Sequence, residues 1–366
     1  MPTNALTDVD CPVQPMPQAR GPLSQWVINA LGGQRSTMPR VAGFDAFGDD
    51  AQLALYLSYE PHFGPIAGLP DAQEWDVQRL TFRQLLEDEF ERALRGATAP
   101  TSHNPSLAEH LYGLVAADRS PSLSRHMETH GTLSEMLDIV MHRSAYQLKE
   151  GDAHTFAIPR LDGRAKQLLV GIQAGEYGAD AAGRRTHAQL FASTMESLGL
   201  RGVPNHYINE LPGSAFAISN LVSMFGLNRR WRGALVGHLA IFEMTSVEPM
   251  RRYANGLGRL GVTPQAGRFY RVHTLADIEH ETMAVELANE VVTAEPDLRD
   301  DVIFGAQCVL ETERRFAATL FEKWSSAATR RGAREEHVDL AGATTDALND
   351  AEIQALLIGE PWFTRF

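Results

Sequence analysis

The chain has 366 residues, 44% of them hydrophobic, which is enough for a sizeable core in one large domain or two ordinary ones. Its 33 basic and 46 acidic residues give a formal net charge of −13, and no dense basic run offsets it, so nucleic acid is excluded as an expected partner. No apolar run approaches the roughly 20 residues that cross a bilayer, and the first residues lack a basic segment followed by an apolar one. We therefore expect a cytoplasmic protein that does not bind membranes.

Residues 1–40 contain several prolines and few periodic apolar positions, which predicts a flexible arm. Residues 41–150 predict a helical region that packs on the rest of the chain. Its helices are expected at Ala51–Tyr59, Asp76–Leu94, Ser106–Ala117 and Thr132–Glu150.

A turn-rich segment after Glu150 separates this region from a second helical group, residues 151–325. Helices are expected there at Arg164–Gly175 leading into Glu176–Leu198, and at Leu211–Phe225, Arg232–Arg259, Gly267–Val292 and Asp301–Trp324. Alternating strand patterns are nearly absent, which favours an all-α bundle. Residues 326–366 predict a linker, a short helix and an aromatic end.

The two cysteines, Cys11 and Cys308, have no Cys-x-x-Cys partner. Both are therefore expected to be free thiols, consistent with a reducing compartment.

Three residues that can bind metal share one helical face near residue 277. His273, Asp277 and His280 fall at positions i, i+4 and i+7, so on a helix they point within about 60° of one another. A face with two imidazoles and a carboxylate suits a metal ion, although a polar face exposed to water is the simpler alternative.

Two other helical segments supply further candidates. Glu243 lies among apolar residues, where an unpaired carboxylate is costly and usually has a cation, a metal or a proton to explain it. Glu248 is the competing acid in that segment, although it could instead pair with Arg251 and Arg252 at a helix end. Glu176 precedes His187 by eleven residues, close to three helical turns, and Asp180 precedes it by seven, close to two. An early acid could instead complement a helix N-terminus.

Other metal-site classes fit less well. The His-Glu-x-x-His pattern of zinc hydrolases does not occur. Ferritin-like bundles use two Glu-x-x-His pairs, and only Asp277 with His280 approximates one.

The ordered set of these three segments resembles the heme-oxygenase-like di-iron oxidases, often labelled iron-containing redox enzymes, over about residues 130–325. The resemblance implies a heme-oxygenase-like helical bundle with an N-terminal helical extension. Carried over by position, it implies two irons per chain with the ligands Glu176, His187, Glu243, His273, Asp277 and His280. The interval before His187 is one residue longer than expected, which leaves Asp180 as an alternative to Glu176. An acid three residues before His187 is missing, and Glu150 could replace it.

The family resemblance implies O2-dependent oxidation of a small amine or an amino-acid-like metabolite. An external electron donor is compatible with this chemistry, and a homodimer is compatible with bundles of this kind. Three alternatives remain open: a heme-binding bundle, with one axial histidine in a large apolar slot; a non-catalytic helical protein that binds a partner; and a site that has degenerated to one metal.

Overall fold

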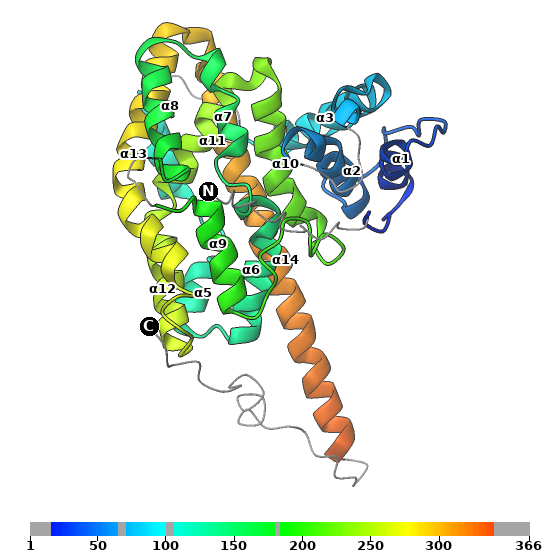
Figure 1. Cartoon of the computed structure of the whole chain (residues 1–366). Coiled ribbons are helices and arrows are strands. Elements are labelled where there is room, and N and C mark those ends of the chain that lie inside the picture. Colours follow the sequence, from blue (N-terminus) through cyan, green and yellow to red (C-terminus); the bar gives the residue numbers. More distant parts are fainter. Residues whose placement is uncertain (1–15, 65–70, 100–105, 180–183, 340–366) are drawn as a thin grey trace, which may run out of the picture. The chain divides into compact units, whose positions relative to one another are not determined.

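The computed structural model describes residues 16–64, 71–99, 106–179 and 184–339 (Figure 1). The α-helices are α1 (Pro22–Leu31), α2 (Asp49–Tyr59), α3 (Val77–Ala97), α4 (Leu107–Ala117), α5 (Leu123–Thr129), α6 (Leu133–Gln147), α7 (Asp152–Thr155), α8 (Gly163–Glu176), α9 (His187–Ser197), α10 (Gly213–Leu227), α11 (Arg232–Met244), α12 (Val247–Arg259), α13 (Arg268–Ala294) and α14 (Arg299–Asp339). Short 3-10 helices lie at Glu60–His62, Asp71–Trp75, Ile158–Arg160, Arg229–Trp231 and Pro296–Leu298. Within these ranges no strand is present, and the expectation of an all-α fold is confirmed.

Contacts divide the chain into two units, Met1–Leu320 and Phe321–Phe366. Where a linker was expected after residue 325, the chain stays helical through Asp339. The predicted short helix and aromatic end lie outside the described residues, as does Cys11. Cys308 is a buried free thiol. The predicted domain boundaries stay predictions.

The centre of the first unit is α13, which packs against α8, α11 and α12. Figure 1 shows α13 beside α8. The buried residues of α13 recur at intervals of three and four along most of its length, as a helix with one core-facing stripe requires. The stripe begins with Phe269 and Tyr270 and ends with Leu287, Ala288 and Val291. Apolar residues thus flank the polar middle of the stripe at both ends.

The N-terminal helices pack onto the same unit through α2. Every residue of α2 from Ala51 to Tyr59 is buried, since α1, α3 and α10 all pack against it. Part of the segment expected to be a flexible arm therefore forms a packed helix, α1, whose Leu23, Val27 and Leu31 are buried.

Two expected helices are each divided in the structure. The helix expected at Glu176–Leu198 is interrupted between α8 and α9, with Gly178 at φ 62°. This backbone conformation suits glycine and ends a helix. Thr186 then caps α9 together with Gln189.

The helix expected at Arg232–Arg259 divides into α11 and α12 at Thr245 and Ser246. Both hydroxyls donate to nearby backbone carbonyls, Thr245 to Ile241 at 2.7 Å and Ser246 to Glu243 at 3.1 Å. Such local bonds compete with the helical ladder. The break leaves Glu243 in the last turn of α11.

The helix expected to reach Glu150 ends at Gln147. Glu150 lies in the turn that follows, next to Gly151 with φ 88°. No helix in the described part of the chain is both long and apolar enough to cross a membrane.

Candidate metal centre

The polar middle of the α13 stripe carries the three residues singled out by their spacing. His273, Asp277 and His280 are all buried, and Asp277 is only 1% exposed. The alternative of a solvent-exposed polar face is therefore wrong for these residues. The solvent-facing side of α13 is occupied instead by residues such as Leu275 and Ile278.

Glu176 and His187 meet although a break separates their helices. Glu176 is the last residue of α8 and His187 is the first of α9. The Nδ1–H of His187 donates to Oε2 of Glu176 at 2.8 Å. The idea that Glu176 opens a helix is wrong, because it lies at a C-terminus, where a negative charge is disfavoured. Asp180, the alternative to Glu176, lies outside the described residues.

Glu150 joins the cluster from the turn after α6. Its Oε2 lies 3.5 Å from Nε2 of His273. With its amide nitrogen turned toward Glu150, Gln147 donates to both carboxylate oxygens at 2.9 and 2.7 Å. This neighbour orients Glu150 and leaves lone pairs free to bind a cation.

Glu243 and His280 complete the cluster. Nδ1 of His280 lies 3.5 Å from Glu176, 3.7 Å from Glu243 and 4.0 Å from Asp277. Glu248 does not take part in the cluster. It pairs on the surface with Arg251 and Arg252, as the alternative interpretation of this residue predicted.

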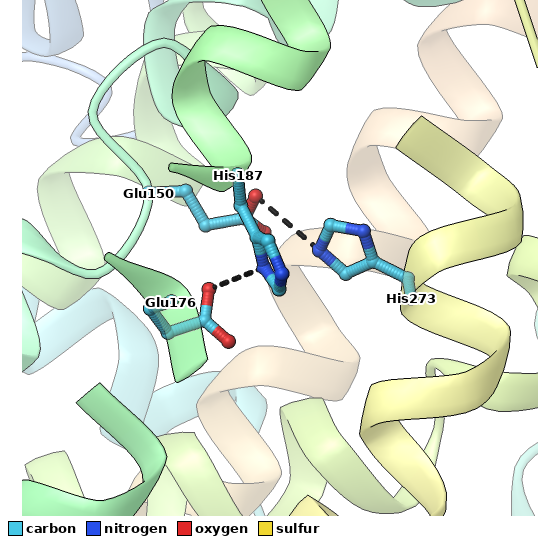
Figure 2. A group of neighbouring side chains, drawn as sticks. All are labelled: Glu150, Glu176, His187 and His273. Carbon is cyan, nitrogen blue, oxygen red and sulfur yellow. Dashed lines mark hydrogen bonds and ion pairs between the residues drawn. The ribbon is translucent and has the colours of Figure 1, made fainter. Parts of the chain in front are cut away.

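The cluster contains two overlapping groups that could each hold a metal ion. In the first, Glu150, Glu176, His187 and His273 offer ligand atoms within 4.8 Å of one another (Figure 2). In the second, Glu176, Glu243 and His280 do the same. Glu176 belongs to both groups, with Oε2 facing His187 and Oε1 facing His280. A carboxylate placed in this way can bridge two cations.

Burial makes the carboxylates of this cluster poor anions in the absence of a metal. It raises the pKa of Glu150, Glu176 and Glu243, and repulsion from Glu176 adds to the effect at Glu150 and Glu243. For Asp277, burial outweighs the attraction of His273 and raises the pKa to about 7. Each of these groups therefore needs a positive neighbour to remain ionised.

The pKa values of the three histidines shift in opposite directions. Burial lowers the pKa of His187 to about 3, and the positive charge of His273 adds to this effect. Burial also disfavours the charged forms of His273 and His280, but the surrounding carboxylates outweigh it and raise their pKa values to about 10 and about 9. Two imidazolium ions thus balance part of the negative charge where no metal is bound.

Four of the buried polar atoms that have no hydrogen-bond partner within the described ranges belong to this cluster. They are Nε2 of His273, Nδ1 of His280 and both carboxylate oxygens of Asp277. Buried polar atoms are normally paired, so these four indicate a missing ligand. The Nδ1–H of His273 donates to the carbonyl of Phe269 at 2.9 Å, which leaves the neutral ring with a lone pair on Nε2. These atoms fit a metal ion.

The part of the chain that contains this cluster also matches a known family of proteins. The sequence model of a family described as iron-containing redox enzymes matches residues 137–314. That range contains every residue of the two groups. This part of the chain is therefore similar to the iron-containing redox enzymes. No curated protein matches the chain.

The similarity to iron-containing redox enzymes agrees with the imidazole and carboxylate groups that the cluster offers. Imidazole and carboxylate ligands suit iron, and neither group found among the described residues includes a cysteine. The structure brings all six residues implied by the resemblance into one buried cluster. The structure also places Glu150 in the cluster. From the sequence, Glu150 was only a possible replacement for a missing acid, at the expected end of a helix.

Proposed function

We propose that this iron-containing redox enzyme is an O2-dependent non-haem di-iron oxidase or oxygenase. Its substrate would be a small amine or an amino-acid-like metabolite. The observation that carries the proposal is the position of Glu176, which belongs to both candidate metal groups.

The charge of the cluster supports two cations. Glu150, Glu176, Glu243 and Asp277 are four buried carboxylates, and together they would carry four negative charges when ionised. Two Fe(II) ions would balance these charges and replace the two imidazolium ions of the metal-free protein. A single ion would leave about half of that buried charge uncompensated, which is costly.

The donor atoms divide between two positions. Glu150, His187 and His273 would hold one iron, Glu243 and His280 the other, and Glu176 would bridge them. Asp277 faces His280 and would complete the second position. Bound iron of this kind would supply the redox chemistry with O2.

The chain's own residues keep water away from this chemistry and prepare the ligands. The cluster lines a small pocket, whose walls include Tyr146, Leu239 and Phe242. Gln147 orients Glu150, and the Phe269 carbonyl orients the His273 ring. We propose that the C–H or N–H to be oxidised lies on the Glu243 and His280 side.

A heme-binding function is less well supported. It needs an axial histidine facing an apolar slot, whereas His187, His273 and His280 each contact a carboxylate. A non-catalytic helical protein would have no use for buried carboxylates at such cost.

Iron loading and oxygen mixing test the proposal. Metal-free protein is titrated anaerobically with Fe(II), and bound iron is counted per chain. The loaded protein is then mixed with O2 while absorbance is followed, with candidate amines and amino acids present or absent. We expect two irons, and O2 consumption that a true substrate accelerates. Saturation at one iron, or no reaction with O2 under any condition, would contradict the proposal.

The proposal also covers the cellular location, the electron donor and the oligomeric state of the protein. We propose a cytoplasmic enzyme that acts on a small molecule, takes electrons from an external donor if its substrate does not supply them, and forms a homodimer. Sedimentation and iron-dependent turnover with a reductant would test these features separately.

A further inference from the structure

A second and larger cavity lies next to the metal centre. It is a cleft of about 1050 Å³, including the part open to solvent. Its walls come from the start of α5, from α6, from the α11–α12 junction and from α12, α13 and α14. Leu123, Ile139, Met250, Val309 and Leu310 make much of this surface apolar. A concave and partly apolar surface with a few polar groups is typical of a small-molecule site.

Phe242 separates the cleft from the metal centre. It lines both cavities, and the next residue in the chain is Glu243. The ring of Phe242 packs against Tyr146, with centroids 5.3 Å apart. Tyr270 also lines the cleft, one helical turn before His273. A molecule held in the cleft would therefore have the iron ligands beyond its Phe242 end.

A charge pair lies in the wall of the cleft. Arg143 of α6 donates from both terminal nitrogens to the carboxylate of Glu313 on α14, at 2.6 and 2.5 Å. The Arg143 side chain is 16% exposed and that of Glu313 is 30% exposed, and both residues line the cleft. Arg143 uses only part of its five N–H donors in this pair, and Glu313 keeps free lone pairs.

Two tyrosines stand beside the pair. Tyr253 and Tyr270 are at least nine-tenths buried, and their rings are 5.3 Å apart. Both tyrosines interact electrostatically with Arg143. Both residues also line the cleft, so a ligand held at the charge pair can reach them.

We infer that the cleft binds the zwitterionic head of an α-amino acid at the Arg143–Glu313 pair. The inference rests on the proposed function and names the substrate class for it. The carboxylate of the ligand would accept from Arg143 and the tyrosine hydroxyls, and its ammonium group would donate to Glu313. The apolar part of its side chain would extend along the cleft toward Phe242 and the irons.

The charge pair favours a zwitterion over a simple ion. Arg143 and Glu313 together carry no net charge, so an amino acid matches both partners at once. A plain carboxylate would be attracted by Arg143 but repelled by Glu313, and a plain amine would meet the reverse. Like charges brought together across a binding site reject the wrong ligand.

Calorimetric titration with three matched probes tests this inference. L-Norleucine carries both charged groups on a five-carbon chain, hexanoate lacks the amine, and pentylamine lacks the carboxylate. Each is titrated into full-length, iron-loaded protein without O2. We expect norleucine to bind at least about tenfold more tightly than either partial analogue, since each charged hydrogen bond lost is worth that much or more. Equal binding of hexanoate or pentylamine would overturn the assignment.

Variants locate the binding. Arg143→Lys keeps the charge but loses the fork of donors, and norleucine affinity should fall by about tenfold. Because an unpaired partner can unfold the protein, the pair is also removed together, as Arg143→Met with Glu313→Leu, which should abolish the preference for norleucine in a folded chain. Arg314→Lys is the matched control, since Arg314 pairs with Glu311 on the surface of the same helix and should leave affinity unchanged. Norleucine binding that survives the double variant would overturn the assignment.

The outcomes separate this inference from the proposed function. A protein that binds two irons and reacts with O2, but does not prefer norleucine, would retain the di-iron proposal and refute the recognition pair. A protein that prefers norleucine but saturates at one iron would refute the di-iron proposal while retaining the recognition pair.

Discussion

Gly175 of α8 lies so close to His280 of α13 that a Cβ atom on it would stand 2.6 Å from Nε2 of the imidazole ring. Real Cβ atoms do not approach other heavy atoms this closely. Because Gly175 has no side chain, His280 of α13 can lie against α8. There it contacts Glu176, the residue that follows Gly175.

Gly175→Ala should displace His280 and weaken the second metal position. Alanine itself favours a helix, so the fold should persist while iron affinity at this position falls by about 10–100-fold, the usual effect of disturbing a ligand's support. Iron titration followed by Mössbauer spectroscopy would measure it.

Gly113→Ala is the matched control, because nothing lies within 4 Å of a Cβ atom at this helical position. It should leave iron binding unchanged and stabilise the protein by about 0.5–1 kcal/mol. Unchanged iron affinity in the Gly175 variant would mean that His280 is not a ligand or that it moves at no cost.

The shared position of Glu176 predicts a hierarchy among alanine variants. Glu243→Ala removes a donor from the second group only, and Glu150→Ala removes one from the first group only. Each should still hold about one iron, whereas Glu176→Ala disturbs both positions and should hold almost none. Iron analysis of each purified variant, checked for folding by circular dichroism, would show the order. Two tightly bound irons in Glu176→Ala would contradict the bridging role.

Metal binding should release protons. Where no metal is bound, carboxylates raise the pKa of His273 to about 10 and of His280 to about 9, so both rings are protonated at pH 7. A metal needs the neutral ring, and therefore about two protons or more should leave as both positions fill, since Asp277 with a pKa of about 7 can also lose one. Affinity should rise with pH until both rings have titrated. Calorimetry in buffers of different ionisation enthalpy counts the protons; a count of zero would exclude His273 and His280 as ligands.

How much of the site the sequence could predict depends on local regularity. His273, Asp277 and His280 lie on one unbroken helix, so their spacing was sufficient to place them on one buried face. Glu176 and His187 lie on two helices, and their meeting depends on the path of the turn at Gly178 rather than on helical phase. The sequence predicted their pairing from a spacing of three helical turns, whereas in the structure a turn between two helices brings them together.

Glu150 shows where such prediction stops. A turn residue has no periodicity, and its role depends on contacts with Gln147 of the preceding helix and His273 far along the chain. The all-α fold was predictable because apolar periodicity is strong. The α11–α12 break also has a signal in the sequence, because Pro249 of α12 has no N–H to donate to the carbonyl of Thr245, four residues earlier.

A second pair of histidines makes a prediction about acid stability. His154 of α7 and His238 of α11 are buried, with Nε2 of His154 3.1 Å from Nδ1 of His238. Burial lowers the pKa of His154 from 6.5 to about 4, and it lowers that of His238 as well, helped by the neighbouring ring. Both rings are neutral in the folded protein near pH 7.

The sign of the effect follows from proton uptake. Between pH 6.5 and about 4 the unfolded chain binds a proton at His154 that the folded chain does not, so stability is lost as the pH falls through this window. At one ring the loss reaches about 3 kcal/mol at the acid end. The buried carboxylates act in the opposite direction, because their raised pKa values favour the folded state at low pH.

The double variant His154→Gln with His238→Gln isolates the histidine contribution. Its amides can still pair with each other but do not titrate, so its free energy of unfolding should fall less steeply than that of the parent from pH 6.5 to 4. Urea denaturation of both metal-free proteins across this range measures the difference, and the carboxylate contribution cancels in the comparison. His130→Gln, at an exposed histidine after α5, is the control and should follow the parent curve. Parallel curves for the parent and the double variant would show that the pair is not buried in its neutral form.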